Sequence, residues 1–339
     1  MAKAIALFSG GLDSQLAVKL MLDQGIEVQG LTSRSVFHQQ RSHEGKEDPA
    51  VAAAERLGVP ITVLNTDDEM LALVKHPKHG VGKNMNPCVD CRIFLLRKAS
   101  EQVRESGADF IVTGEVLGQR PMSQRKYAMA LIDREADVEG RVVRPLCAKL
   151  MEPTIAEKDG LVDREKLLAI RGRSRKEQMA LAEKLGITEY PSPAGGCLLT
   201  DPGFSRRLAE LMEHRAPDVN DTELLKLGRH FRLDDRTKAV VGRDEGENCE
   251  IEGLAREGDL LLDAADVMGP TTLLRGEASE SNVAIAARLT VKYGKARNEA
   301  SARVTVRRAT TDESSVLTAP PAADERAAQL MITRQADAG

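Results

Sequence analysis

The sequence predicts an α/β protein: a doubly wound parallel sheet followed by a smaller C-terminal α+β domain. Apolar runs suited to buried strands alternate with helix-forming segments through the first part of the chain. Beyond residue 221 the pattern changes to short strands separated by turn signals, then an amphipathic helix. The length of 339 residues allows about two folded units.

The first strand is the apolar run from Ile5 to Phe8, and a helix with apolar spacing follows the next turn. Further strands are expected at 27–32, 61–64 and 109–113, a strand pair at 127–133 and 141–146, and helices at 49–57, 88–103 and 163–186. Strands and helices in this alternation predict right-handed crossovers and a nucleotide at the carboxyl edge of the sheet.

The turn after the first strand reads Ser9-Gly10-Gly11-Leu12-Asp13-Ser14. Its glycines allow close backbone approach to an anion, and the N–H groups at the start of the next helix carry partial positive charge. The turn is therefore suited to phosphate. The alternative is an ordinary strand-to-helix turn in which a Ser or Asp side chain caps the helix. It is not a Walker loop, because no Gly-Lys-Ser/Thr follows.

The composition is that of a soluble protein, with 42% hydrophobic residues and a net charge of -4. We expect a cytoplasmic protein with no membrane partner, since no signal peptide or membrane span is evident. Net acidity disfavours nonspecific nucleic-acid binding, so any RNA contact must come from local patches. Arg171, Arg173, Arg175 and Lys176 form such a patch, although a basic run can also be a solvated face.

Three of the five cysteines stand in positions that suit chemistry. Cys88 and Cys91 have C-x-x-C spacing at the start of a helix, where the dipole favours thiolate. Cys197 lies in a Pro/Gly-rich loop at 190–202. Cys147 follows an apolar strand and is interpreted as packing, and Cys249 as structural or incidental. C-x-x-C alone also occurs in zinc knuckles, redox dithiols and iron–sulfur sites.

The string from Ser9 to Ser14 resembles the signature of the PP-loop ATP pyrophosphatases, which have a HUP-like fold. The resemblance implies ATP and Mg²⁺, with adenylation of a carbonyl oxygen and release of pyrophosphate. It places Asp13 near Mg²⁺ or the phosphate chain. By the same analogy the ATP-binding residues are Ser9, Gly10, Gly11, Leu12, Asp13, Ser14, Leu31, Thr32 and Gly114.

Two cysteine segments resemble those of the bacterial tRNA 2-thiouridine synthetases: Asn86-Pro87-Cys88-Val89-Asp90-Cys91 and Ala194-Gly195-Gly196-Cys197. The resemblance makes Cys91 and Cys197 catalytic. Cys88 departs from the common pattern, which has aspartate there, and resembles the iron–sulfur-dependent tRNA thiolases. In those enzymes three cysteines, here Cys88, Cys91 and Cys197, hold a [4Fe–4S] cluster with one open iron.

Alternatives stay open at each level. Cys91 and Cys197 could instead act as a persulfide and its resolving thiol, and a fourth ligand would suit structural zinc. The expected function is an ATP-dependent tRNA sulfurtransferase that replaces a uridine carbonyl oxygen with sulfur, supplied as sulfide or by a cysteine desulfurase relay. The rivals are a PP-loop enzyme acting on a small molecule and a non-catalytic RNA-binding protein.

The predicted organisation has three parts. Residues 1–216 form the PP-loop thiolase domain, with a helical and cysteine-loop part at about 150–216 and a linker at 215–221. Residues 221–308 resemble the RNA-binding module of the NFACT proteins, in Gly228-Arg229-His230-Phe231, Val241–Asn248 and Gly269-Pro270-Thr271. Residues 309–339 are expected to be a disordered tail, because apolar periodicity fades.

Overall fold

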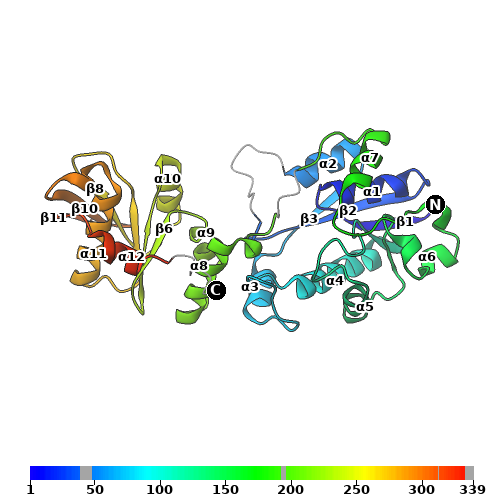
Figure 1. The fold of residues 1–339 in the computed structure, drawn as a ribbon, viewed down its shortest axis with the longest axis horizontal. Helices are drawn as coiled ribbons and strands as arrows, with labels where there is room; N and C mark the ends of the chain where they lie inside the picture. The colour runs from blue at the N-terminus through cyan, green and yellow to red at the C-terminus, as the bar shows by residue number, and fades with distance from the viewer. Residues whose placement is uncertain (39–47, 192–195, 312, 333–339) are drawn as a thin grey trace. The chain divides into compact units, whose positions relative to one another are not determined.

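The computed structural model describes residues 1–38, 48–191, 196–311 and 313–332. The chain divides into two compact units, Met1–Leu198 and Leu199–Gly339, and each is described by itself (Figure 1). Within the described ranges no helix has the length and apolar character needed to cross a membrane. The predicted α/β fold with a separate, smaller α+β unit is confirmed.

The first unit alternates strands and helices along most of its length. Its strands are β1 (Lys3–Leu7), β2 (Glu27–Arg34), β3 (Ile61–Asn65), β4 (Phe110–Thr113) and β5 (Val142–Val143). Its α-helices are α1 (Leu12–Leu22), α2 (Pro49–Leu57), α3 (Asp67–Lys75), α4 (Cys88–Ser106), α5 (Lys126–Glu135), α6 (Ile155–Lys158) and α7 (Lys176–Lys184). Single 3-10 turns lie at Ala148–Leu150 and Arg164–Lys166, and a third at Leu198–Thr200 spans the boundary between the units.

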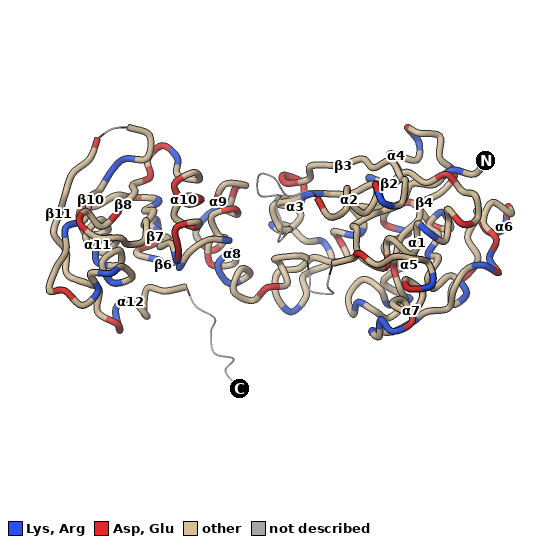
Figure 2. The backbone as a smooth tube through the Cα atoms, turned by 90° about the horizontal axis from the view of Figure 1, so that it is seen from above, with Lys and Arg blue, Asp and Glu red and all other residues tan. Residues whose placement is uncertain are grey.

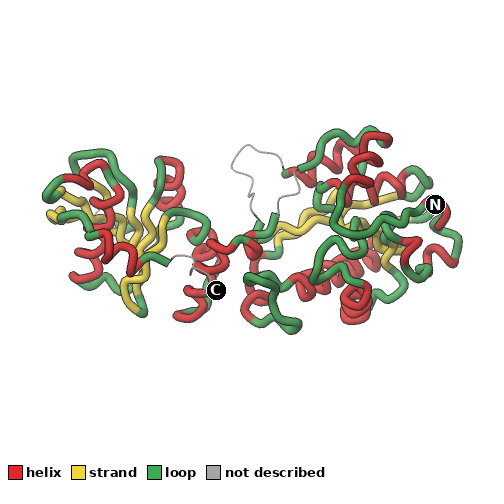
Figure 3. Tube along the Cα trace, viewed as in Figure 1, coloured by secondary structure: helices red, strands yellow, loops and turns green. Residues whose placement is uncertain are grey.

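The sheet of the first unit has the order β3-β2-β1-β4-β5, with every neighbouring pair parallel. Figure 3 shows these strands in yellow, with helices in red around them. From β1 the chain builds outward in one direction through β2 and β3, then returns to place β4 on the other side of β1. This reversal opens a crevice at the carboxyl ends of β1 and β4, where open α/β sheets bind ligands.

Helices cover both faces of this sheet, α1 and α2 on one and α4 and α5 on the other (Figure 1). On the first face Met21 of α1 and Ala53 of α2 pack against Val28. On the second, Leu96 of α4 and Ile132 of α5 pack in a separate apolar cluster with strand residues. Both faces of the strands are therefore apolar, as burial in a parallel sheet requires.

The second unit contains an antiparallel sheet with helices on both sides. Its strands are β6 (Arg229–Asp234), β7 (Thr237–Val241), β8 (Leu260–Ala264), β9 (Thr272–Arg275), β10 (Ala302–Arg308) and β11 (Ser314–Ala319). Its helices are α8 (Pro202–His214), α9 (Val219–Leu224), α10 (Glu245–Gly253), α11 (Glu280–Tyr293) and α12 (Asp324–Leu330), with a 3-10 turn at Lys295–Asn298.

The order of this sheet is β11-β10-β8-β9-β7-β6. One face packs on α11 and α12 through a cluster that includes Phe231, Leu289 and Ala327. The other face packs on α9 and α10 through Leu224 and Ile251. Figure 2 shows acidic and basic residues interspersed along the backbone of both units, in keeping with the net charge of -4.

Two secondary-structure predictions for the first unit are wrong. The segment 127–133 is not a strand but lies within α5, where Ala128, Met129 and Ile132 are buried at helical spacing. The expected helix over 163–186 reduces to the 3-10 turn at Arg164–Lys166 and to α7. Only β5 of the proposed strand pair forms, and it pairs with β4 in parallel.

The predicted linker at 215–221 is also wrong. Asp218 and Asp221 form a capping box that starts α9, and Asp221 is 3% exposed. The structure divides the chain after Leu198, so α8 belongs to the second unit and not to a domain ending at residue 216. Proline and turn formers here mark a helix start rather than an interdomain connection.

The predicted disordered tail is ordered through residue 332, apart from residue 312, which is not described. β11 pairs with β10 over six residue pairs, from Ala302 with Ala319 to Arg307 with Ser314. α12 then packs Ala327 and Leu330 into the core beside Phe231. Residues 333–339 lie outside the described part of the chain.

Candidate functional site

The turn after β1 is shaped by its two glycines. Gly10 has φ +70°, and a Cβ there would lie 2.6 Å from the carbonyl oxygen of Pro49 at the start of α2. Gln15 fixes the turn by donating a 2.7 Å hydrogen bond to the carbonyl of Gly10. Gly11 is the N-cap of α1, and no side chain caps this helix. The capping alternative for this turn is therefore wrong, and the first N–H groups of α1 remain available to an anion.

Asp13, in the first turn of α1, has one satisfied and one unsatisfied carboxylate oxygen. Oδ2 accepts a 3.0 Å hydrogen bond from the side-chain amide of Gln119. Oδ1 is buried without a hydrogen-bond partner among the described residues. A buried carboxylate oxygen in this condition fits a hard cation such as Mg²⁺, which takes oxygen ligands.

Gly114, directly after β4, is in contact with the turn. A Cβ at Gly114 would lie 2.6 Å from the carbonyl carbon and oxygen of Asp13 and 2.6 Å from the backbone nitrogen of Ser14. Only glycine allows the end of β4 to approach the start of α1 so closely. The glycine predicted to border the nucleoside thus sets the width of the crevice between β1 and β4.

The C-x-x-C segment begins α4, on the other face of the sheet. Cys88 is the first residue of that helix, and the N–H of Cys91 donates to the carbonyl of Pro87 at 2.9 Å. Both cysteines are half-buried free thiols. The Asn86 side-chain amide donates a 3.2 Å hydrogen bond to the Cys88 sulfur.

Cys197 reaches this place from the end of the first unit. It forms a β-bridge with His38, and the N–H of Leu198 donates to the carbonyl of Phe37 at 2.8 Å. Burial raises the pKa of the Cys91 thiol to about 12; the charges of Arg92 and Arg120 oppose the rise, and those of the Cys197 and Cys88 thiols add to it. The charges of the other two cysteines named from the sequence therefore both reach Cys91. Residues 194 and 195 of the motif before Cys197 lie outside the described residues.

Residues 118–124, which we call the bridging loop, connect the turn to the cysteines. The loop is closed by a 2.6 Å bond from the N–H of Gly118 to the carbonyl of Gln124. Gln119 contacts Asp13, and Met122 accepts a 3.5 Å contact at its sulfur from the Asn86 amide that also reaches Cys88. One short segment thus touches both halves of the site.

A buried ion-pair network holds α4 against the end of β4. Glu115, 1% exposed, pairs with Arg92 at 3.0 Å and with Arg144 at 2.9 Å. Arg144 also forms a two-pronged pair with Asp133 of α5. Burial opposes the charged form of Glu115, but the two arginines outweigh it and lower the pKa of that carboxyl. Arg92 follows Cys91 directly, so this network fixes the first turn of α4.

The donor set of the three thiols fits an iron–sulfur cluster, which normally takes cysteine ligands. Their arrangement is not that of a closed metal site: in the described ranges no three His, Cys, Asp or Glu side chains are placed to hold a metal ion. In the metal-free protein Cys91, with its raised pKa, is a neutral thiol at physiological pH. Loading a metal there must release protons.

The remaining residues named from the sequence are interior, except Cys249. Leu31 packs in the apolar cluster with Ile5 below the site, and Thr32 is 9% exposed on the same strand. Cys147 is fully buried and contacts the Glu115 carbonyl at 3.3 Å, consistent with packing. Cys249 is exposed on α10 of the second unit.

The basic cluster begins beside the bridging loop. Arg171 forms a β-bridge with Leu117, and the N–H of Gly172 donates to the carbonyl of Leu117 at 2.8 Å. Arg171, Arg173 and Lys176 are exposed. The roles of Gln119, Met122 and Glu115 were missed from the sequence. The one signal in the sequence was a polar run at 118–124 shortly after the strand that ends at Thr113.

Comparison with known families assigns both units. Residues 1–156 match the family described as "Thiamine biosynthesis protein (ThiI)", and residues 228–331 match the "NFACT protein RNA binding domain". Each unit thus contains one of the two matched segments. The resemblances stated from the sequence agree with both matches, and the NFACT-type match extends through the ordered region that had been predicted as a tail.

Relatives of the ThiI-type domain include tRNA-modifying enzymes. The tRNA-specific 2-thiouridylase MnmA of Syntrophotalea carbinolica is 33% identical over 32% of this chain and 33% of its own length. MnmA of Methylobacterium radiotolerans is 27% identical over 80% of this chain and 71% of its own length. A solved 4-thiouridine synthetase–RNA complex with bound ATP is similar at a TM-score of 0.37 and 22% identity, over 66% of this chain and 53% of that one. The chain thus spans between a third and about 70% of these two MnmA relatives.

Proposed function

We propose that this chain is an ATP-dependent tRNA sulfurtransferase that adenylates a uridine carbonyl and replaces its oxygen with sulfur. The bridging loop is the observation on which the proposal depends. It contacts Asp13 at the phosphate-binding turn and the Asn86–Cys88 pair at the cysteines. An activated carbonyl formed at the turn would therefore lie beside the thiols.

The first step activates the uridine. The carbonyl oxygen attacks the α-phosphorus of ATP, pyrophosphate leaves, and the base carries AMP on its former oxygen. The uncapped N–H groups of α1 hold the phosphates. Asp13, whose Oδ1 has no hydrogen-bond partner among the described residues, would hold Mg²⁺, and Gln119 orients that carboxylate through Oδ2.

In the second step sulfur adds to the activated carbon and AMP leaves with the oxygen. Cys88, Cys91 and Cys197 would hold the [4Fe–4S] cluster, which when bound supplies an open iron for sulfide. The chain's own residues position these thiols: the Arg92–Glu115 pair fixes the first turn of α4, and the His38 bridge fixes Cys197. The persulfide alternative uses only Cys91 and Cys197.

The RNA is bound by basic side chains outside the chemical centre. Arg171 lies next to the bridging loop, and neither it nor Arg173 forms an ion pair with any described residue. Lifting the target base from its stack costs on the order of a few kcal/mol, which phosphate contacts offset. The description of the matched NFACT family supports an RNA-binding role for the second unit.

Anaerobically purified protein, incubated with ATP, Mg²⁺, sulfide and unmodified tRNA, tests the proposal. We expect release of AMP and pyrophosphate that depends on tRNA, with one new thionucleoside seen by mass spectrometry of the digested RNA. ATP turnover without tRNA dependence would instead indicate a small-molecule substrate. Absence of any ATP turnover would favour the non-catalytic RNA-binding alternative.

A further inference from the structure

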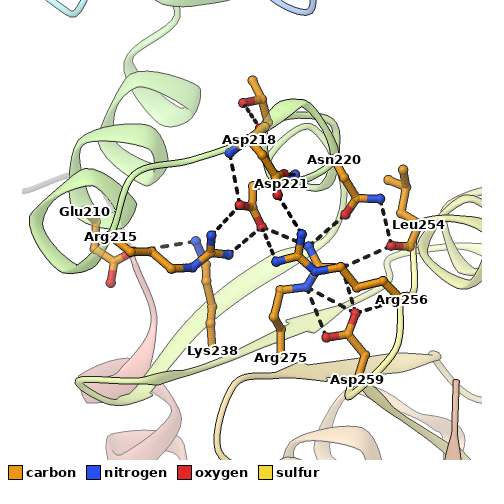
Figure 4. Close-up of polar contacts among 11 residues, drawn as sticks. Glu210, Arg215, Asp218, Asn220, Asp221, Lys238, Leu254, Arg256, Asp259 and Arg275 are labelled. Atoms are coloured by element: carbon orange, nitrogen blue, oxygen red, sulfur yellow. Dashed lines mark hydrogen bonds and ion pairs between the residues drawn. The ribbon is translucent and has the colours of Figure 1, made fainter. Parts of the chain in front are cut away.

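The second unit contains a cavity of about 300 Å³ that the proposed chemistry does not use. It lies between the sheet face formed by β6, β7 and β9 and the segments that carry α8 and α9. Six of its lining side chains are cations and three are carboxylates. Figure 4 shows the carboxylate of Asp221 between Arg215, Arg256 and Arg275 on one side of it.

Three of the lining cations form a single row across the sheet. Arg232 of β6 is directly opposite Lys238 of β7, and Lys238 is directly opposite Arg275 of β9. We call these residues the cation row. Like charges at directly opposite positions destabilise a sheet, so a row of three cations needs compensating negative charge nearby.

The protein supplies those charges unevenly. Arg275 pairs with Asp259 at 2.7 Å and with Asp221 at 3.0 Å. Arg232 and Lys238 share one carboxylate, that of Glu210, at 2.5 Å and 3.5 Å. His214 also lies 3.4 Å from Glu210. The Arg232–Lys238 end of the row therefore has more cations than carboxylates.

This end of the row also has unused hydrogen-bond donors. Lys238 is 7% exposed, and its Nζ makes no hydrogen bond to a described residue. Nη2 of Arg232 is also buried and has no hydrogen-bond partner among the described residues. Burial and the charge of Arg232 lower the pKa of Lys238 to about 8 despite the opposing charge of Glu210. The buried ammonium of Lys238 is therefore only partly compensated by Glu210, which it shares with Arg232.

His230 adds an acceptor to the cavity wall. Its Nε2 lies 2.7 Å from the carbonyl oxygen of Leu227, so Nε2 carries the proton and donates, which leaves Nδ1 as an acceptor. The ring is 2% exposed, and Nδ1 has no partner among the described residues. A matching ligand thus has a hydroxyl donor beside its anionic oxygens.

We propose that this cavity binds a ribose phosphate, with phosphate oxygens on Lys238 and Arg232 and a sugar hydroxyl donating to Nδ1 of His230. Arg236, whose side chain is 82% exposed, lies at the mouth of the cavity and guides the anion inward. The ligand is either a nucleotide unit of RNA or a free nucleotide. The RNA source rests on the proposed function; the phosphate site itself does not.

Calorimetric titration of the full chain with inorganic phosphate and with uridine 3′-monophosphate tests the site, and fluorescence anisotropy with a labelled tRNA transcript tests the source. The first variant is Lys238→Met, which removes the buried charge. The second is Arg236→Met, which leaves the buried ion pairs intact, so that a loss of binding in this variant cannot be explained by misfolding. Arg303→Met is the matched control. Its side chain is 59% exposed on β10, which β8 and β9 separate from β7.

We expect Lys238→Met to weaken uridine monophosphate and tRNA binding by about tenfold, Arg236→Met to weaken both by less, and Arg303→Met to leave both unchanged. The 2′-deoxy nucleotide should bind more weakly than the ribonucleotide. If Lys238→Met lost affinity for the nucleotide but not for tRNA, the cavity would still be a nucleotide site, but its ligand would not be RNA. Equal effects of all three variants, or none, would overturn the site. Failure of tRNA thiolation with phosphate binding intact would count against the proposed function alone.

Discussion

The side-chain amide of Gln119 donates to Oδ2 of Asp13 at 3.0 Å, although the two residues come from opposite sides of the crevice between β1 and β4. This contact orients the one carboxylate at the phosphate-binding turn and leaves its Oδ1 unpaired. It also ties the turn to the bridging loop, whose Met122 contacts Asn86.

Gln119→Ala removes that donor without adding bulk. We expect kcat/KM for ATP-dependent AMP release to fall by about tenfold or more, because a hydrogen bond to a charged group is lost. Gln29→Ala is the control, since it deletes an equivalent 3.2 Å side-chain bond to Thr62 between β2 and β3. Equal kinetics for the two variants would remove Gln119 from the site.

Gly114→Ala places a methyl group where backbone atoms of Asp13 and Ser14 lie 2.6 Å away. The turn must move, so we expect ATP binding to be lost and the free energy of unfolding to fall by about 1–3 kcal/mol. Gly253→Ala, at the end of α10 with no atom within 4 Å of the added carbon, should be harmless. Thermal unfolding and ATP titration check both variants. Unchanged ATP affinity in Gly114→Ala would show that β4 does not limit the crevice.

The cysteines separate the two sulfur-transfer schemes. Cys91→Ser and Cys197→Ser should abolish thionucleoside formation while tRNA-dependent AMP release persists. Cys88→Ser should do the same, and because all three cysteines are proposed cluster ligands, each of the three variants should also lose iron and visible absorption after anaerobic purification. The exposed Cys249→Ser is the control, with full activity expected. If Cys88→Ser still transferred sulfur, the cluster scheme would be excluded in favour of the persulfide mechanism, which uses only Cys91 and Cys197.

The second unit should be sensitive to the loss of Asp221. Its buried carboxylate pairs with Arg215 at 2.5 Å and with Arg275 at 3.0 Å. Asp221→Asn leaves these arginines without their charge partner, and we expect the free energy of unfolding to fall by about 3–5 kcal/mol. Asp266→Asn breaks an exposed 3.4 Å pair with Arg303 and should cost less than about 1 kcal/mol. Urea unfolding followed by hydrogen exchange in α9 and β9 measures both.

Acid should weaken the second unit in two steps. Burial lowers the pKa of His230 well below 6.5, and the charges of Lys238 and Arg207 add to this. The unfolded chain therefore takes up a proton below pH 6.5 that the folded unit refuses, and stability falls from there. Burial opposes ionisation of Asp221, but bonds from Arg215 and the Asp218 N–H lower its pKa from 3.8 to about 2. Its contribution is complete above pH 3.8 and is lost as the pH falls towards 2.

Hydrogen exchange in β6 and β9 between pH 7 and pH 3 checks this profile. His230→Gln should flatten the first step, because the group that binds a proton only in the unfolded chain is gone. If the loss of stability below pH 6.5 were equally large in His230→Gln, it would have to come from the titration of another residue.

Local patterns predicted the parts of the fold that depend on strong local signals. The turn from Ser9 to Ser14 lies between β1 and α1 as expected, and Cys88 begins α4. A short apolar run such as 127–133 fits either a strand or a helix, and only packing on α4 makes it α5. β11 is an edge strand with mostly exposed side chains, so its composition cannot be told from that of a tail.

The contacts within the site could not be predicted in the same way. Gln119 contacts Asp13, and Cys197 comes near enough for its charge to act on Cys91, only after the crossovers of the sheet are complete. A sequence pattern places such residues at strand ends but does not pair them. Chemistry-bearing types were recognised from the sequence, whereas their partners Gln119, Met122 and Glu115 required the tertiary fold.

The bridge between His38 and Cys197 has a mechanical consequence. Leu198, the last residue of the first unit, is hydrogen-bonded through its N–H to Phe37, and the second unit starts at the next residue. Residues 199–227 of the second unit lie between this anchor and the portion that matches an RNA-binding family. Tension applied through the second unit would first load the strand-like contact at Phe37 and His38, so the contact that fixes Cys197 is also the point at which the second unit pulls on the first.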